Sequence, residues 1–207
     1  MTNDYKERYN ELMQILKEDQ NIDIQLCCAA GSRAYGTADE SSDYDFTVVR
    51  ANTPEEILTD KKTKPTHHII GDIDIKIYPF NNFIELLLKQ NPNLLEIFGL
   101  RPEDFFYISD EMKQILINKA LFLSKKAASS YKGYAMSCYQ HAMMAYVNKK
   151  ARTDAAHWRK KAAKSMFECL RIYEQGTQLF KTGEIKTCIN DSEVAYTLSK
   201  AKSGDIL

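Results

Sequence analysis

A small-residue turn followed by two closely spaced carboxylates is the feature of this sequence that most constrains its fold. The segment GSRAYGTADESSDYDF begins at Gly31, directly after an apolar run typical of a buried strand. Asp43 and Asp45 then open a second apolar run, rich in β-branched and aromatic residues, that extends to Arg50. Because successive side chains of a strand alternate between its faces, Asp43 and Asp45 are expected to share one face of a sheet.

Two neighbouring carboxylates repel each other, and a cation between them relieves the repulsion. A hard divalent metal that also carries phosphate oxygens is the ligand that best suits such a pair. The turn at Gly31 and Ser32 offers backbone N–H groups and a hydroxyl, which suit phosphates. An Asp-x-Asp pair alone is weak evidence, because the same residues are common in turns and at strand ends.

Asp74 is the third carboxylate that the pattern singles out. Residues 67–80 (HHIIGDIDIKIYPF) alternate between polar and apolar side chains, which predicts a strand, with a hairpin partner around 68–70 and a turn at Gly71. A carboxylate among alternating isoleucines is costly to bury without a partner, so Asp74 is predicted to join Asp43 and Asp45. Asp72, next to the glycine, is interpreted as a turn residue.

The composition sets outer limits on what the chain does. It has 207 residues, 44% of them hydrophobic, and 28 basic residues balance 28 acidic ones, so that no overall charge favours a nucleic acid. Its five cysteines lack CxxC spacing, which predicts reduced thiols and a cytoplasmic protein. The polar N-terminus resembles no signal peptide, and no apolar run approaches the ~20 residues that span a bilayer, so no membrane association is expected.

The pattern changes character near residue 100. Before that point, helical spacing over 4–18, 54–58 and 80–98, interrupted at Pro92, alternates with strand-like runs, and Thr53 is expected to cap the helix at 54. After it, the pattern predicts only helices, over 109–126, 129–149, 154–182 and 191–202. We therefore predict an α/β (α+β) fold in two domains, a core with a small mixed sheet over 1–108 and a helical bundle over 109–207.

These motifs resemble the polymerase-β-like nucleotidyltransferase superfamily, whose signature is a Gly-Ser turn followed by an Asp-x-Asp strand. The fuller segment GSRAYGTADESSDYDF is similar to its RNA-repair-pathway polymerase-β branch. Three later segments fit that branch as well: DIDIKIY, FIELLLKQNPNLLEIF and KSMFECLRIYEQGTQLFKTGEI. Together the matching segments lie between residues 24 and 185.

The resemblance implies a division of roles among the motif residues. Asp43, Asp45 and Asp74 would be catalytic and would bind two Mg²⁺ or Mn²⁺ ions, and Asp74 would help to activate the attacking hydroxyl. Ser32 and the backbone at Gly31 would hold a nucleoside triphosphate. Arg33 lies beside this turn and is expected to neutralise charge on the nucleotide, with an ordinary exposed arginine as the alternative.

A basic segment between residues 149 and 171 is the candidate for the opposite wall of such a site. Lys164 and Arg171 lie two helical turns apart on one face, and the resemblance favours nucleotide binding by both. For Lys149 to Arg152, a solvated surface is the preferred interpretation. Trp158 with His157 could stack on a base or anchor the helix. His67, His68 and His141 have no ligand spacing and are interpreted as structural.

The predicted reaction is metal-dependent transfer of a nucleoside monophosphate from a nucleoside triphosphate to an acceptor hydroxyl, with release of pyrophosphate. The branch suggests an RNA end as acceptor. The alternatives are a protein acceptor, as in adenylylating antitoxins of the same superfamily, and a catalytically silent nucleotide-binding module.

Overall fold

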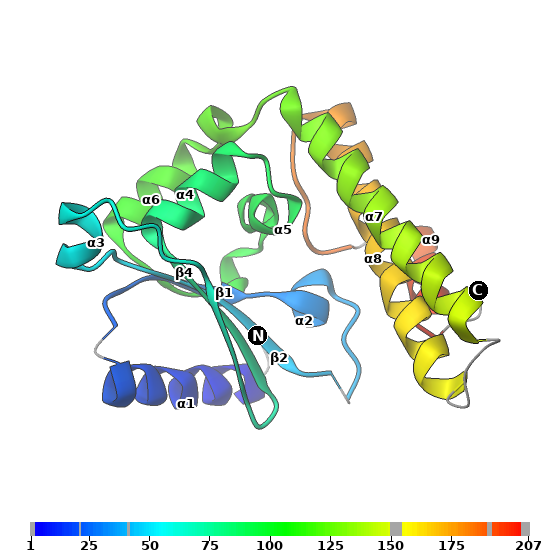
Figure 1. The fold of residues 1–207 in the computed structure, drawn as a ribbon, viewed down its shortest axis with the longest axis horizontal. Helices are drawn as coiled ribbons and strands as arrows, with labels where there is room; N and C mark the ends of the chain where they lie inside the picture. The colour runs from blue at the N-terminus through cyan, green and yellow to red at the C-terminus, as the bar shows by residue number, and fades with distance from the viewer. Residues whose placement is uncertain (1–2, 21, 41, 150–154, 190–191, 204–207) are drawn as a thin grey trace.

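The computed structural model describes residues 3–20, 22–40, 42–149, 155–189 and 192–203, and these form a sheet with helices on both faces (Figure 1). The strands are β1 (Ile24–Ala29), β2 (Tyr44–Arg50), β3 (Thr66–Ile70), β4 (Ile73–Pro79) and β5 (Phe105–Ile108). They lie in the order β3-β4-β2-β1-β5, with β2 and β4 parallel and the other neighbours antiparallel. The predicted α/β class with a small mixed sheet is confirmed.

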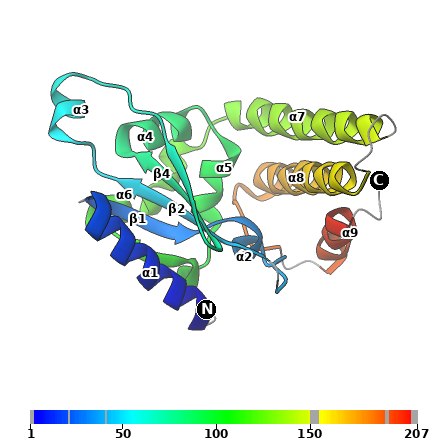
Figure 2. The same ribbon diagram turned by 60° about the horizontal axis from the view of Figure 1, so that its bottom comes forward.

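The helices fall into a set that covers the sheet and a set that extends beyond it. The first set is α1 (Asn3–Gln20), α2 (Gly31–Tyr35), α3 (Pro54–Leu58), α4 (Phe80–Leu88), α5 (Pro92–Leu95) and α6 (Asp110–Ile117). The second is α7 (Lys126–Lys149), α8 (Ala155–Thr182) and α9 (Ser192–Ser203). Short 3₁₀ turns lie at Glu96–Gly99, Pro102–Asp104 and Lys119–Phe122. Figure 2 shows α7 and α8 side by side beyond α2, which confirms the predicted C-terminal helical part.

One face of the sheet is closed by α1. Tyr5, Leu12 and Leu16 of this helix join the side chains of β1, β2 and β4 that point toward it, among them Phe46 and Ile75. The Tyr5 ring stacks on Phe46 with centroids 5.2 Å apart. Burial of this alternate set of residues explains the period-2 pattern of the sequence and leaves their neighbours in each strand on the opposite face.

The opposite face is only partly covered. Leu26, Cys28 and Val49 pack under α4, α5 and α6 and reach residues of α7 and α8, including Tyr131 and Ile172. This second core therefore draws on both halves of the chain, while the division into domains 1–108 and 109–207 stays a prediction. Toward the beginning of β2 and β4 the same face carries polar side chains instead.

Two of the expected element boundaries are wrong. The chain is not purely helical after residue 100, because Phe105–Ile108 forms β5 against β1, with Leu26 opposite Ile108. This run of four apolar residues has no alternation and is too short to stand out in the sequence. The single helix expected over 109–126 is also wrong: α6 ends at Ile117, where Asn118 caps it by donating its side-chain amide to the Gln114 carbonyl.

Other local predictions are confirmed. Thr53 caps α3 in a reciprocal capping box with Glu56. The turn at Gly71 joins β3 to β4, and Gly183, with a φ of 75°, ends α8. At Gly31 the expected turn is the start of the short helix α2, which ends at Gly36 in the left-handed conformation.

The cysteines give a direct test of this packing. Cys27 and Cys28 are fully buried in β1, and burial raises the pKa of both thiols, whereas Cys138, Cys169 and Cys188 are partly exposed. We expect a thiol reagent such as Ellman's reagent to modify at most these three of the five cysteines in the folded protein, and all five in guanidinium chloride. Rapid native modification of a fourth thiol, located by mass spectrometry, would contradict the placement of β1 inside the sheet, between β2 and β5.

Candidate active site

Asp45 lies directly over Gly31, where β1 ends and α2 begins. A Cβ atom added to Gly31 would lie only 2.5 Å from Cγ of Asp45, and Gly31 has a φ of +62°. The backbone of Asp45 is fixed from two sides, since its carbonyl accepts hydrogen bonds from the Ala30 N–H at 2.9 Å and the Tyr5 hydroxyl at 2.8 Å. Glycine is therefore needed at position 31 both for its backbone conformation and for the space that the carboxylate occupies.

Asp74 lies beside Asp45 on the same face of the sheet. The two residues are direct partners in the parallel pairing of β2 with β4. Asp43 is exposed just before β2, two residues from Asp45. The pKa of Asp45 is raised to about 6, chiefly by burial and also by the charges of Asp74 and Asp43, while Lys76 and Lys164 oppose the rise. The three predicted carboxylates are thus close enough to interact, and their mutual repulsion favours a cation.

His67 is a residue of this site for which the sequence predicted only a structural role. Its Nε2 atom lies 2.7 Å from Oδ1 of Asp74, and the side chain is half exposed. The contact arises because β3 and β4 pair antiparallel, with His67 opposite Lys76 and Ile69 opposite Asp74. Simple continuation of the DIDIK alternation would place His68 on the carboxylate face; the hairpin, which pairs Ile70 with Ile73, places His67 there instead.

Arg33 is held against the protein backbone. Its guanidinium donates hydrogen bonds to the carbonyls of Asp43, at 3.1 Å, and Ser42, at 2.7 Å. It also lies over the Tyr44 ring, with the guanidinium carbon 3.8 Å from the ring centre. These contacts fix the segment that leads into β2, and Ser32, beside it, is half buried.

Helix α9 holds the loop before Asp43. The Lys202 ammonium group lies 2.8 Å from the Asp39 carboxylate and donates a hydrogen bond to the Thr37 carbonyl at 3.0 Å. The loop between α2 and β2 is therefore tied at both ends, by Arg33 at one and by the C-terminal helix at the other.

Lys164 and Arg171 lie on the same face of α8 but in different surroundings. Lys164 is exposed and contributes to the potential at Asp45. Arg171 leaves only 1% of its side chain exposed, and its guanidinium is paired with Glu96 at 2.9 Å and Glu168 at 2.6 Å. The structure therefore leaves Lys164 near enough to Asp45 to act on it electrostatically and places Arg171, two turns further along α8, inside the protein.

The buried network around Arg171 lies beneath α2. The guanidinium carbon is 4.1 Å from the centre of the Tyr35 ring, and the Tyr35 hydroxyl donates to the Glu96 carboxylate at 3.2 Å. Gln175 accepts a further hydrogen bond from Arg171 at 3.1 Å. Burial raises the pKa of Glu96, and the charge of Arg171 opposes that rise. These contacts join α8 to the helix that carries Gly31 and Ser32.

The rest of the basic segment is described only in part. Lys150 and Arg152 lie outside the described residues, as does the side chain of Lys149. Trp158 meets His157 edge to face at 5.5 Å, and the Lys161 ammonium lies 5.1 Å from its ring centre.

The three carboxylates are chemically suitable ligands for a divalent metal. Within the described residues, no three acidic, histidine or cysteine side chains converge on one point as in a preformed metal site. Asp43, Asp45 and Asp74 nonetheless offer the hard oxygen donors that Mg²⁺ and Mn²⁺ prefer, and a cation would offset both the burial of Asp45 and its repulsion from Asp74 and Asp43, the causes that raise its pKa. The donor set fits a divalent metal held by these three residues.

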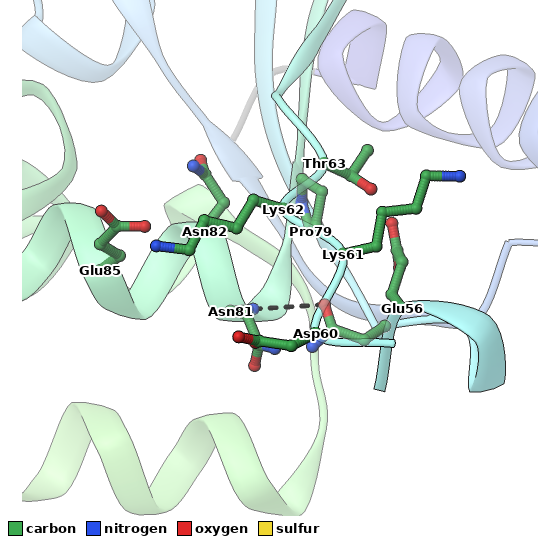
Figure 3. A pocket seen from close by; sticks show the side chains of 10 residues that line it. Glu56, Asp60, Lys61, Lys62, Thr63, Pro79, Asn81, Asn82 and Glu85 are labelled. Atoms are coloured by element: carbon green, nitrogen blue, oxygen red, sulfur yellow. Dashed lines mark hydrogen bonds between the residues drawn. The ribbon is translucent and has the colours of Figure 1, made fainter. Parts of the chain in front are cut away.

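A shallow pocket at the other end of the sheet is a different feature (Figure 3). It follows the C-terminal ends of β2 and β4, whereas Asp45 and Asp74 lie near the beginning of those strands. Its charged side chains are of both signs, and Glu56 is already paired with Arg50 at 2.7 Å. Asn52 accepts a hydrogen bond from the first turn of α4 at 3.3 Å. These contacts stabilise local structure, and the carboxylate face remains the candidate site.

Comparisons with known proteins relate the chain to one family. A family model described as RNA repair pathway DNA polymerase beta family matches residues 5–199. Among solved structures, the chain is similar to a nucleotidyltransferase-like protein from Exiguobacterium sibiricum 255-15, with a TM-score of 0.39 and 8% sequence identity, over 97% of this chain and 72% of that one. No curated protein matches the sequence.

Substitutions at Gly31 and Gly71 form a matched pair that tests how closely the Asp45 side chain approaches Gly31. Both have a φ near +60°, but a Cβ at Gly71 meets nothing within 4 Å. Gly71→Ala is expected to cost only backbone strain, about 1–2 kcal/mol of unfolding free energy. Gly31→Ala adds an overlap with Asp45 and is expected to cost about 1–3 kcal/mol more. Equal losses in urea denaturation would contradict the close approach of Asp45 to Gly31.

The Arg171 network predicts a large stability effect. Arg171→Ala leaves Glu96 buried without its partner, and we expect the unfolding free energy to fall by about 3–5 kcal/mol. The control is Arg8→Ala, which breaks a half-exposed ion pair to Asp72 that contributes little to stability. A loss for Arg171→Ala as small as that of the control would show that the buried pair is not what holds α8 to the core.

Proposed function

The chain belongs to the RNA repair pathway DNA polymerase beta family, and from this premise we propose that it transfers a nucleoside monophosphate to the end of an RNA strand. The donor is a nucleoside triphosphate, the acceptor is a terminal hydroxyl, and pyrophosphate is released. Membership of the family supports nucleotidyl transfer in general. The single observation that carries the proposal is the pairing of Asp45 with Asp74 on the open face of the sheet, beside Gly31.

Asp43, Asp45 and Asp74 are assigned as the ligands of divalent metal ions, Mg²⁺ or Mn²⁺. When bound, such ions lower the pKa of an attacking hydroxyl and neutralise the charge of a leaving pyrophosphate. Asp45 connects the metal ligands with the turn assigned to the triphosphate, because it lies between Asp74 on β4 and the turn at Gly31. Its seat over Gly31 limits how far its carboxylate can shift, which preorganises the site.

The chain's own residues bind and orient the donor. We assign Ser32 and the backbone at Gly31 to the triphosphate, and Lys164 to its negative charge from the opposite side. Lys164 is exposed and acts electrostatically on Asp45, as this role requires. Alignment of the α-phosphorus with the attacking oxygen is the main contribution expected of the protein in such transfers.

Asp74 and His67 are assigned to the acceptor hydroxyl. The hydrogen bond between Nε2 of His67 and Oδ1 of Asp74 fixes the orientation of this carboxylate. His67 thus acts as a positioning residue, and Asp74 faces the hydroxyl that attacks.

Arg33 and Arg171 were predicted to contact the nucleotide, and we now assign them a supporting role. Arg33 holds the backbone on either side of the Ser42–Asp43 bond, and Arg171 holds Tyr35 of α2. Both thereby position Asp43 and the Gly31 turn. Nucleotide contact by Arg171 would require it to leave its ion pairs with Glu96 and Glu168, at the full cost of an unpaired buried charge.

We also place this activity in the cytoplasm. All five cysteines are outside disulfides, as expected in a reducing compartment. Among the helices that the structure describes, none has both the length and the apolar character to cross a bilayer.

Nucleotide transfer can be tested with an RNA oligonucleotide that ends in a free 3′ hydroxyl, each labelled nucleoside triphosphate in turn, and Mg²⁺. Extension by one nucleotide, resolved on a sequencing gel, is the expected result. Asp45→Asn and Asp74→Asn each remove a metal ligand worth several kcal/mol of transition-state stabilisation, so extension is expected to fall by about a thousandfold or more. Asp72→Asn, on the same hairpin but paired with Arg8, should leave the rate within about twofold because an exposed ion pair contributes little.

A second measurement follows the metal without turnover. Mg²⁺ should raise the melting temperature of the wild type and of Asp72→Asn, but not that of Asp45→Asn, because a ligand stabilises only the folded state that binds it. Extension that persists in Asp45→Asn would overturn the metal assignment. Labelling of protein in place of RNA would favour a protein acceptor, and nucleotide binding without any transfer would favour a silent binding module.

A further inference from the structure

The β3–β4 hairpin presents three side chains beside the carboxylates that the assigned roles use only in part. In the antiparallel pairing, Ile69 is opposite Asp74 and His67 is opposite Lys76. Directly opposed residues share one face of a sheet. The contact from His67 to Asp74 and the effect of Lys76 on the pKa of Asp45 both place this face on the side of the carboxylates. We call His67, Ile69 and Lys76 the hairpin shelf.

Ile69 is the unexpected member of the shelf. Its side chain is 69% exposed and belongs to neither hydrophobic core, whereas the next residue, Ile70, packs against the core under α1. Single exposed apolar residues are ordinary on protein surfaces. What distinguishes Ile69 is its place directly across from Asp74, where an apolar surface borders the carboxylate assigned to the acceptor hydroxyl.

Sheet order puts His67 and Ile69 of the shelf on one side of the carboxylates and the donor residues on the other, while Lys76 lies on β4 two residues beyond Asp74. Going across the sheet, β3 and β4 precede β2, and β1 with the Gly31 turn follows it. Lys164 comes from α8, which the views in Figures 1 and 2 show beyond α2 and away from α3. A triphosphate at Gly31 and Ser32 therefore leaves the β3 side of Asp74 for the second substrate.

We propose that the hairpin shelf binds the 3′ end of the acceptor RNA, with the terminal base on Ile69 and a backbone phosphate at Lys76. This inference rests on the proposed function and deepens it. An apolar side chain under a base and a cation at the phosphate are the two contacts that hold an unpaired nucleotide. Ile69 is the direct partner of Asp74, and Lys76 is two residues further along β4 on the same face, so that a base on Ile69 brings its ribose hydroxyl to the carboxylate. An extended polypeptide acceptor would instead form hydrogen bonds with the backbone along the edge strand β3. The side chains of the hairpin shelf would take no part in that pairing.

The test separates RNA binding from donor binding. We would measure the anisotropy of a fluorescein-labelled single-stranded RNA of ten nucleotides, with Mg²⁺ and a non-hydrolysable nucleoside triphosphate present. Ile69→Ser and Lys76→Gln are expected to weaken RNA binding about tenfold each and to leave the affinity for the triphosphate alone within twofold. Both side chains are exposed, so that the variants are expected to fold.

Matched controls come from the far end of the sheet. Ile57→Ser alters an equally exposed isoleucine, 65% exposed on α3, and Lys62→Gln alters an exposed lysine of the pocket in Figure 3. Neither should change RNA affinity by more than twofold. If Lys62→Gln weakened RNA binding as much as Lys76→Gln, RNA would be attracted to any exposed lysine, and the assignment of the shelf would be wrong.

The remaining outcomes distinguish the shelf from the reaction. If Ile69→Ser and Lys76→Gln bind RNA as the wild type does while the wild type still extends RNA, the shelf assignment is wrong and the proposed function survives. If these variants lose labelling of a protein but keep RNA affinity, the shelf receives a polypeptide and the RNA assignment is wrong. If the wild type binds triphosphate but transfers it to no acceptor, the proposed function itself fails.

Discussion

The buried ion pair between Arg171 and Glu96 is the interaction on which the arrangement of the site depends. It joins α8 to the 3₁₀ turn that follows α5, and through Tyr35 it fixes α2 from below. Gly31 begins that helix, and Asp45 is seated on Gly31. A charge pair this deep is costly to desolvate, and its value here lies in geometry, because this placement of α8 lets Arg171 reach Glu96 and the Tyr35 ring together. The same placement sends Lys164 toward the carboxylates.

At the surface end of the same sheet, like charges repel one another instead of being paired. There, Asp43, Asp45 and Asp74 crowd like charges onto one face, and burial holds the pKa of Asp45 near 6. This crowding destabilises the metal-free protein, and the stability that tolerates it comes from the aromatic packing of α1 behind β2 and from the apolar core under α4. A cation bound at the proposed site would relieve this repulsion, and such a loss of stability at a functional site is a common compromise between stability and activity.

Much of this was predictable from local sequence patterns. The alternation around Asp74 predicted its strand, the small residues at Gly31 and Ser32 predicted a turn after β1, and Thr53 with its proline marked the start of α3 correctly. Each of these signals is contained in a few consecutive residues. The strand β5 was missed because its four residues become a strand only through pairing with β1, a partner almost eighty positions earlier in the chain. The break after α6 was missed because its cap, Asn118, resembles any polar residue of a helix.

The burial of Arg171 shows what local sequence patterns do not predict. Helical spacing placed Lys164 and Arg171 correctly on one face, but spacing alone does not say how deep that face is buried at each turn. Depth is set by Glu96 and Tyr35, residues distant in sequence whose polarity at buried positions makes sense only once Arg171 lies between them. His67 shows the same limit in reverse, since its partner Asp74 is seven residues away and across a turn. In both cases the side chain's role is decided by a charge that the fold brings to it, and the chemistry of this site therefore depends on pairings across the sheet as much as on the motif itself.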